Sequence, residues 1–336
     1  MGQDFWHPMN WLLSADLHLS DRARDSYRFG LFPWLKKQQQ KNKVDATFLL
    51  GDLTQEKDRH SSALVNRIVE ELLTLIPPVY IVRGNHDGID SNSPFFKFLN
   101  SISGLNFVVK PTFLHKYEIA MIPHCADQAT LNAACKQMPI NPKAVFLHQT
   151  IGGAIAETGA VLSGLSASPV SALKPWLGVY SGDVHVPQRC ADVTYVGAPY
   201  TIRFGDRFEP RCLLIKGGGK SDLHFDCPRK HSLIIRDADD IINNKALRSG
   251  DQVKITVELA REEAVEWHEH KRRVLAACRE GGLDVFGIDC TVKAARRERV
   301  KLDEGVKANR PQDVFEAFCS NEGIAHNIKR AGLELL

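Results

Sequence analysis

The chain has 336 residues, which suggests about two domains and is long enough for a large buried core. Apolar residues make up 43% and charged residues 25%, as is typical of a soluble globular protein. The formal net charge of +3 is too small to indicate a polyanionic partner, so a nucleic-acid assignment needs local evidence. No apolar run reaches the ~18 residues that a membrane span needs, so we expect no membrane association.

The eight cysteines are scattered, and none belongs to a C-x-x-C pair. This excludes the usual spacing of a zinc knuckle or a redox dithiol, and it fits a reducing cytosol better than a secreted disulfide scaffold. The segment from Met1 to Trp6 lacks a basic region followed by an apolar stretch, so we expect no signal peptide. Together these features predict a cytoplasmic protein.

The first two thirds of the chain alternate between strand-like and helix-like segments. Apolar, strand-like runs occur at residues 11–13, 47–50, 79–82, 144–147 and 177–180. Between them, residues 63–73 have helical spacing up to Pro77, a short helix is expected after Pro94, and Pro33 is expected to interrupt any helix in residues 22–37. This alternation predicts an α/β core of two sheets packed face to face with helices outside.

The rest of the chain changes character. Residues 152–171, rich in Gly, Ala and Ser, predict a long mobile loop beside the site, and residues 217–219 predict a turn or a boundary. After Pro228, two strands, a charged amphipathic helix at 261–279 and a strand at 283–292 predict a small α+β unit. A basic stretch and a helical tail with an apolar stripe follow. The predicted divisions are residues 1–227, 228–293, 294–310 and 311–336.

Side chains that can bind a metal ion (Asp, His or Asn) follow each of the five strand-like runs. Because ligands of open α/β sheets gather at the carboxyl ends of the strands, we expect these side chains to converge. A single Asp-x-His or Gly-Asp is weak evidence, because it is more often a loop cap or a turn, but the whole set in this order is unlikely to arise by chance. The candidate residues are Asp16, His18, Asp52, Asn85, His86, His148, Asp183 and His185.

This set of carboxylate, amide and imidazole ligands is enough for two divalent metal ions. Two cations roughly 3.5–4 Å apart can clamp the attacking and leaving oxygens of a phosphoryl centre and lower the pKa of a bound water. Asp52 is the natural bridging carboxylate, and mixed N/O sites suit Mn²⁺, Fe²⁺ or Zn²⁺. His86, beside Asn85, is expected to stabilise charge or to protonate the leaving oxygen.

The set resembles the calcineurin-like metallophosphoesterase superfamily. The resemblance implies one metal held by Asp16, His18, Asp52 and His185, and another held by Asp52, Asn85, His148 and Asp183. It also implies a two-sheet sandwich flanked by helices. The family's last motif is usually Gly-His-x-His, whereas this chain has Asp183 at the first His. An Asp ligand favours Mn²⁺ or Mg²⁺; the alternative is that Asp183 only accepts a hydrogen bond.

Within the superfamily the chain is most similar to SbcD-type DNA double-strand-break nucleases of bacteria and phages. Three features carry this: the segment Val196–Asp206, the small α+β unit where the family has a DNA-capping domain, and the helical tail. The resemblance implies a Mn²⁺-dependent 3′→5′ exonuclease and single-strand endonuclease acting at duplex ends. It implies a homodimer; the cluster of Phe95, Phe96, Phe98 and Leu99 suits the dimer contact and the protein core equally. It also implies an SbcC-type coiled-coil ATPase partner bound by the tail.

Weaker candidates have equal structural alternatives. Arg59 and His60 stand where the nuclease family often touches the DNA backbone, but they also suit a solvated helix start. The basic stretch at 293–310 suits phosphates or a solvated linker equally. Two other functions remain open: a small-molecule phosphodiesterase or phosphatase with the same metal site, and a non-catalytic scaffold on the same fold.

Overall fold

The computed structural model describes residues 9–90, 93–292, 311–324 and 326–333. The described residues fall into two compact units. The larger lies within residues Met1–Val257 and His268–Asp289, and the smaller within Glu258–Trp267 and Cys290–Leu336. The larger unit contains all the candidate ligands.

Two six-stranded sheets form the centre of the larger unit. The first has the order β12-β11-β1-β2-β3-β4 and the second the order β5-β6-β7-β8-β10-β9. The first is built from β1 (Trp11–Ser14), β2 (Ala46–Leu50), β3 (Val79–Val82), β4 (Leu105–Val108), β11 (Cys212–Lys216) and β12 (Gly219–Leu223). The second is built from β5 (Thr112–Leu114), β6 (Ile119–Ile122), β7 (Ala144–His148), β8 (Gly178–Gly182), β9 (Gln188–Cys190) and β10 (Val193–Tyr195).

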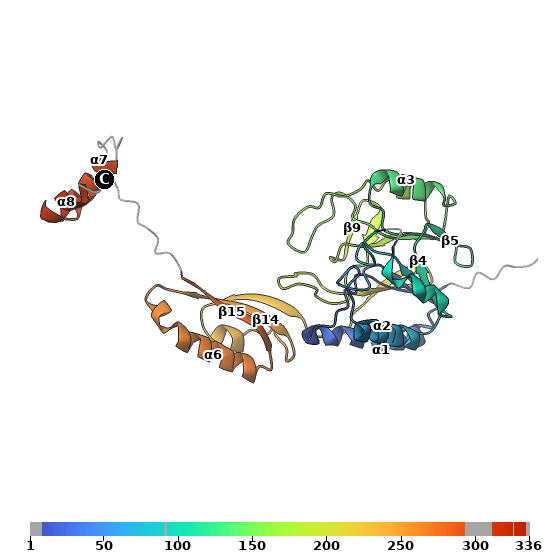
Figure 1. The fold of residues 1–336 in the computed structure, drawn as a ribbon, viewed down its shortest axis with the longest axis horizontal. Coiled ribbons are helices and arrows are strands. Elements are labelled where there is room, and N and C mark those ends of the chain that lie inside the picture. The colour runs from blue at the N-terminus through green and yellow to red at the C-terminus, as the bar shows by residue number, and fades with distance from the viewer. Residues whose placement is uncertain (1–8, 91–92, 293–310, 325, 334–336) are drawn as a thin grey trace, which may run out of the picture. The chain divides into compact units, whose positions relative to one another are not determined.

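Helices cover the outer faces of both sheets (Figure 1). The helices α1 (Leu31–Asn42) and α2 (Ser62–Thr74) lie against the first sheet, with the 3₁₀ segments η1 (Ala23–Gly30) and η2 (Phe95–Ser101) beside them. The helix α3 (Gln128–Lys136) and the short α4 (Ser168–Ser171) lie against the second sheet. The predicted two-sheet sandwich with helices outside is therefore confirmed.

Strand periodicity explains this layering. Successive side chains of a strand point to opposite faces, so Leu12 packs toward α1 and α2 while Trp11 and Leu13 pack between the sheets. Aromatic rings fill the space between the sheets: Phe48 and Phe146 lie 4.7 Å apart at their centroids, and both contact Trp11. Because parallel strands β1, β2 and β3 run side by side, their carboxyl ends share one edge.

One local expectation was wrong. Pro33 does not interrupt a helix, because α1 begins at Leu31 and the proline lies in its first turn, where its missing N–H has no intrahelical partner. The segment 152–171 is a long loop up to α4, as predicted, and its mobility stays a prediction. It is tied by the bridges Ile151↔Leu165 and Ile155↔Val161 and ends in α4. The glycines at 217–219 form the predicted turn, between β11 and β12.

A third sheet, of three strands in the order β13-β14-β15, follows the sandwich. Its strands are β13 (Lys230–Ile235), β14 (Gln252–Leu259) and β15 (Asp284–Val292). The helices in this region are α5 (Asp239–Ile242), the 3₁₀ segment η3 (Glu263–Glu266) and α6 (Trp267–Glu280). The strands agree with the predicted α+β unit. Its main helix starts at Trp267 instead of residue 261.

A buried ionic network joins β13 to the 3₁₀ segment η1. The Lys230 Nζ lies 2.8 Å from Asp25 Oδ1, and Arg28 Nη2 lies 3.3 Å from the same oxygen. Arg28 also donates a hydrogen bond to the carbonyl of His18, and Lys230 donates one to the carbonyl of Ile202. All three charged side chains are buried. Such groups are costly to bury unless they are paired, and removing one partner is strongly destabilising.

The tail contains two helices, α7 (Pro311–Asn321) and α8 (His326–Leu333), and the first begins at Pro311 as predicted. The basic stretch at 293–310 and the segment Met1–Trp6 lie outside the described residues. All eight cysteines are free thiols. Among the described helices, none combines the length and the apolar character that crossing a membrane requires.

Candidate metal centre

The structure brings all eight candidate side chains of the predicted centre to one edge of the sandwich. Asp16 and His18 follow β1, Asp52 follows β2, and Asn85 and His86 follow β3. From the second sheet, His148 ends β7, and Asp183 and His185 follow β8. A cavity of about 250 Å³ opens over them, and six of the eight line it: His18, Asp52, Asn85, His86, Asp183 and His185. Asp16 and His148 are fully buried behind it.

Unusual backbone conformations aim these side chains. Asp16, His18, Asp52 and Asp183 have φ angles of 54°, 44°, 53° and 78°, in the left-handed region that non-glycine residues seldom adopt. Such strain clusters at functional sites, where the surrounding structure maintains it. Close packing adds to this: a Cβ on Gly84 would lie 2.2 Å from Asp52 Oδ1, so this position admits only glycine.

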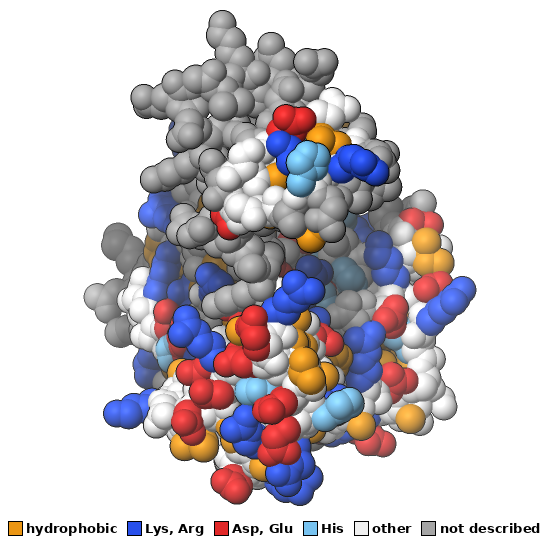
Figure 2. Space-filling model, turned by 90° about the vertical axis from the view of Figure 1, so that its left-hand side faces the viewer, with side chains coloured by type: hydrophobic (Ala, Val, Ile, Leu, Met, Phe, Trp, Pro, Cys, Tyr) orange, Lys and Arg blue, Asp and Glu red, His pale blue; other side chains and the backbone are white. Residues whose placement is uncertain are grey.

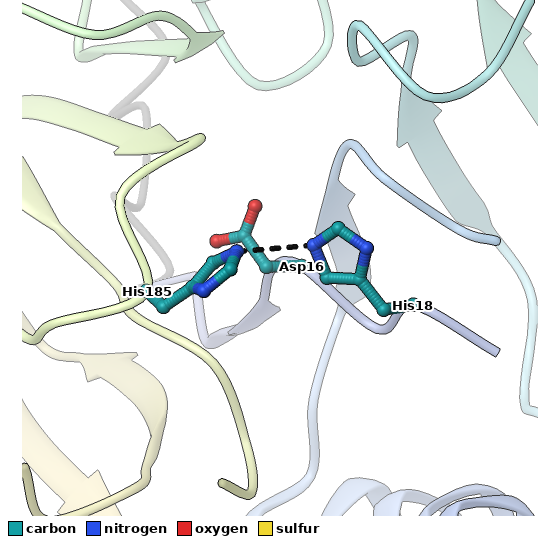
Figure 3. Close-up of side chains that lie close together, drawn as sticks. All are labelled: Asp16, His18 and His185. Atoms are coloured by element: carbon teal, nitrogen blue, oxygen red, sulfur yellow. Dashed lines mark hydrogen bonds between the residues drawn. The ribbon is translucent and has the colours of Figure 1, made fainter. Parts of the chain in front are cut away.

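The first group of donors is Asp16, His18 and His185 (Figure 3). The Nε2 atoms of His18 and His185 lie 3.1 Å apart and face one another. The Asp16 Oδ2 is buried and has no hydrogen-bond partner, while its Oδ1 accepts from the backbone N–H of Asp183 at 2.9 Å. Two facing imidazole nitrogens beside an unpartnered carboxylate oxygen form the donor set of a divalent cation.

The second group surrounds His148. Its Nε2 lies 3.3 Å from Asp52 Oδ1, 3.6 Å from Asp183 Oδ1 and 3.2 Å from Asn85 Oδ1. Its Nδ1 lies 2.7 Å from the Leu50 carbonyl, which can accept the ring proton and leave Nε2 free as a ligand. The other oxygen of Asp52 lies 3.6 Å from His18 Nε2. Asp52 therefore faces both groups, as a bridging carboxylate would.

Electrostatics fits a site for cations. Burial raises the pKa of the Asp16 carboxyl to about 7, and the Asp52 carboxylate also raises it. For His148, burial lowers the pKa, but the carboxylates of Asp52, Asp183 and Asp16 outweigh it and raise the pKa well above the ordinary value. Several carboxylates crowded against one imidazole need positive charge to be stable together. The residues present therefore fit a pair of divalent metal ions.

His86 lies beside the metal donors in a different way. Its backbone N–H donates to Asp52 Oδ1 at 2.9 Å, and its ring packs edge to face against the ring of His18. Its Nδ1 lies 2.7 Å from the Gln55 carbonyl, so Nε2 is the ring atom left for a substrate oxygen. This is the arrangement expected of a group that handles a proton near the reacting phosphate.

One residue that sequence reasoning missed organises the first sheet's loops. Asp87 is fully buried, and its carboxylate accepts hydrogen bonds from the backbone N–H groups of Asp52 at 3.0 Å, Leu53 at 2.9 Å and Gly84 at 2.7 Å. It thereby fixes the Asp52 loop and the Asn85 loop against each other. The signal was the fourth residue of the Gly84–Asp87 motif, which is a carboxylate.

Two further missed residues support the donors of the second sheet. The Glu157 carboxylate lies 2.7 Å from His185 Nδ1, in close but poorly directed contact, on the ring side opposite Nε2. The Thr150 hydroxyl donates to Asp183 Oδ2, while Asp183 Oδ1 faces His148. Asp183 thus accepts a hydrogen bond with one oxygen and keeps the other toward the metal donors, which agrees with a ligand role.

Arg59 and His60, the predicted DNA contacts, do not line the cavity. Arg59 is exposed. The His60 ring packs against Phe95 and Phe96, at 4.3 Å and 5.5 Å between centroids, and both its nitrogens lack hydrogen-bond partners. His60 therefore takes part in packing η2, and its contact with DNA stays a prediction.

The fold and the donor set together agree with the prediction of a metal-dependent phosphoesterase. Residues 9–125 match the family model described as "Calcineurin-like phosphoesterase", a segment that includes the donors from Asp16 to Asn85. This part of the chain is therefore similar to calcineurin-like phosphoesterases, which agrees with the predicted metal centre. A structure of a dimetal phosphatase from Danio rerio is similar at 14% identity and a TM-score of 0.39, over 65% of this chain and 99% of that one. No curated protein matches the chain.

Proposed function

We propose that the protein is a metal-dependent DNA nuclease that hydrolyses phosphodiester bonds at duplex ends. The supporting observation is the position of the α+β unit at the rim of the metal cavity. Ile202 and Arg203 line the cavity, and the next residue, Phe204, packs against Phe286 of β15 with ring centroids 4.7 Å apart. A second folded unit beside the cavity suits a long polymeric substrate better than it suits a small ester.

The residues of the centre have distinct tasks in this proposal. Bound divalent cations, for which Mn²⁺ is the proposed choice and Mg²⁺ the alternative, would supply Lewis acidity toward water and the phosphoryl group. Asp16, His18, Asp52 and His185 would hold one cation, and Asp52, Asn85, His148 and Asp183 would hold the other. His86 donates the proton that the leaving oxygen needs from Nε2, while the Gln55 carbonyl keeps its ring in place.

The proposed partners come from the resemblance to SbcD-type nucleases. A coiled-coil ATPase of the SbcC type would bind the tail, whose apolar side chains Val314 and Ile328 are 37% and 60% exposed. A second copy of the chain would contact η2, where Phe98 is 42% exposed while Phe96 and Leu99 are buried. The 3′→5′ exonuclease and single-strand endonuclease activities, and action in the cytosol of a bacterium or an infected host, belong to this proposal.

The test is cleavage of end-labelled duplex DNA by the purified full chain with Mn²⁺, with and without a co-purified partner. His86→Ala is expected to lower the rate about 10²–10⁴-fold, because it removes a general acid. Mn²⁺ affinity should not change. His115→Ala, an exposed histidine between β5 and β6, is the matched control and should keep full activity. Equal cleavage by the wild type and His86→Ala would contradict the mechanism.

A small-molecule phosphoesterase is the second candidate. On the face drawn in Figure 2, the described acidic and basic side chains are interspersed and are not sorted into a basic surface for a polyanion. Turnover of nucleotides or aryl phosphates by a wild-type protein that leaves DNA intact would favour this candidate.

A further inference from the structure

One permanent positive charge lies at the metal cavity. Of the described residues that line the cavity, Arg203 is the only lysine or arginine; the other charged or titratable lining groups are carboxylates and histidines. A phosphate ester is anionic, and a guanidinium matches the geometry of phosphate oxygens with paired N–H donors.

The backbone of the Arg203 segment is held in place from two sides. The Asp206 Oδ2 accepts hydrogen bonds from the N–H groups of Ile202 at 2.8 Å and Arg203 at 2.9 Å. The Ile202 carbonyl accepts from Lys230 Nζ at 3.3 Å and from Arg28 Nη2 at 3.4 Å. The side chain of Arg203 starts from this fixed segment but is itself exposed. It is therefore well positioned for a ligand.

The guanidinium also lacks an internal counter-ion. Among the described residues, no carboxylate lies within 4.0 Å of it, in contrast to Arg211 and Arg229, which are paired with Asp222 and Glu209. Glu157 and His185 line the same cavity as Arg203, and the Glu157 carboxylate lies 2.7 Å from His185 Nδ1. Glu157 is therefore paired with His185, and within the described part of the chain no carboxylate forms an ion pair with Arg203.

We propose that Arg203 binds the phosphate next to the reacting one in a polynucleotide strand, and that this contact makes the site favour nucleic acid over small phosphate esters. This inference rests on the proposed nuclease function. The reacting phosphate belongs with the buried donors at the floor of the cavity. The exposed rim, where Arg203 stands, is the place for the next phosphate along the strand, a group that a small ester does not have.

Kinetics on two substrates tests the proposal. On a short single-stranded oligonucleotide, Arg203→Ala should raise KM about 10- to 100-fold with little change in kcat, because the contact is equally strong in the ground and transition states. On bis(p-nitrophenyl) phosphate, the same variant should match the wild type. Arg203→Lys should recover part of the loss, since it keeps the charge but not the paired donors.

A matched control and a binding measurement complete the test. Arg207→Ala removes an exposed arginine of the same loop that does not line the cavity, and it should behave as wild type.

The fluorescence anisotropy of a labelled oligonucleotide, measured in EDTA, reports binding without turnover. Arg203→Ala should bind more weakly, and the slope of log K against log salt should be shallower by about 0.7, the value for one lost phosphate contact on a single strand.

The outcomes separate this inference from the proposed function. If the wild type cleaves the oligonucleotide and Arg203→Ala does so with the same KM, only this inference is wrong. An equal loss on both substrates would place Arg203 at the reacting phosphate or in the fold, and would also overturn it. If the wild type hydrolyses only the small ester, the proposed function fails and this inference fails with it.

Discussion

The two sheets each supply half of the metal centre, but they hold their donors by different means. In the first sheet, the loops that carry Asp52 and Asn85 are fixed through backbone N–H groups bound to the Asp87 carboxylate. In the second sheet, His185 and Asp183 are supported by the single side chains of Glu157 and Thr150. The donor loops of the first sheet are therefore held by main-chain hydrogen bonds to one carboxylate. Each of these two donors of the second sheet is held by one neighbouring side chain, so a single substitution can change its position without moving the other.

The largest effect is expected in the first half. Asp87→Ala leaves three buried N–H groups without an acceptor, so we expect a loss of about 3–6 kcal/mol in the free energy of unfolding. Metal binding should fail at both positions, since the Asp52 and Asn85 loops lose their common anchor. Denaturant unfolding and calorimetric titration with Mn²⁺ measure the two effects. Asp58→Ala, an exposed carboxylate on the same loop, is the control; similar behaviour of the two variants would contradict the comparison.

A smaller and more selective effect is expected in the second half. Glu157→Gln removes the negative charge against His185 Nδ1 and should weaken Mn²⁺ binding about 10- to 100-fold at one of two positions, the range for groups that orient ligands. Stability should change little, because Glu157 is on the cavity wall and not in the core. Calorimetric titration would separate the two binding steps. Glu56→Gln, an exposed carboxylate, should bind both ions as the wild type does, and equal weakening at both positions would argue against the assignment.

The smallest effect is expected at Asp183. Asp183→His should keep or raise metal-dependent activity, because an imidazole nitrogen can replace the carboxylate oxygen as a ligand. Thr150→Val is the companion variant, since it removes only the hydrogen bond to Asp183. Phosphodiester hydrolysis across a Mn²⁺ series measures both. If Asp183 served only to accept that hydrogen bond, Thr150→Val and Asp183→His would lose activity together.

The sequence allowed the strand ends, and therefore the donors, to be predicted because each donor follows a short apolar run. Residues 11–13 and 47–50, for example, are followed by Asp16 and Asp52, and the left-handed turns then direct both side chains inward. Glu157, Thr150 and Arg203 were not predicted. They lie in loops whose path depends on long-range pairing, such as the bridge Ile151↔Leu165. The residues next to each position in the sequence do not predict such pairing.

The Pro33 prediction failed for a related reason. The rule that proline ends a helix applies to the interior, and whether a position is interior depends on where the helix begins. Here the helix begins at Leu31, two residues before the proline, after the 3₁₀ segment η1. The start of a helix that packs on a sheet is decided by tertiary contacts as much as by local propensity.

The Lys230–Asp25–Arg28 network bears on how this enzyme could be re-engineered. A chimera joined near residue 228 would separate Lys230 from Asp25 and leave a buried carboxylate with Arg28 as its remaining cation. Arg28 also donates a hydrogen bond to the carbonyl of His18, so a shift of Arg28 would displace this candidate metal ligand. Any exchange of the α+β unit between relatives would therefore have to carry the matching residues of η1 with it.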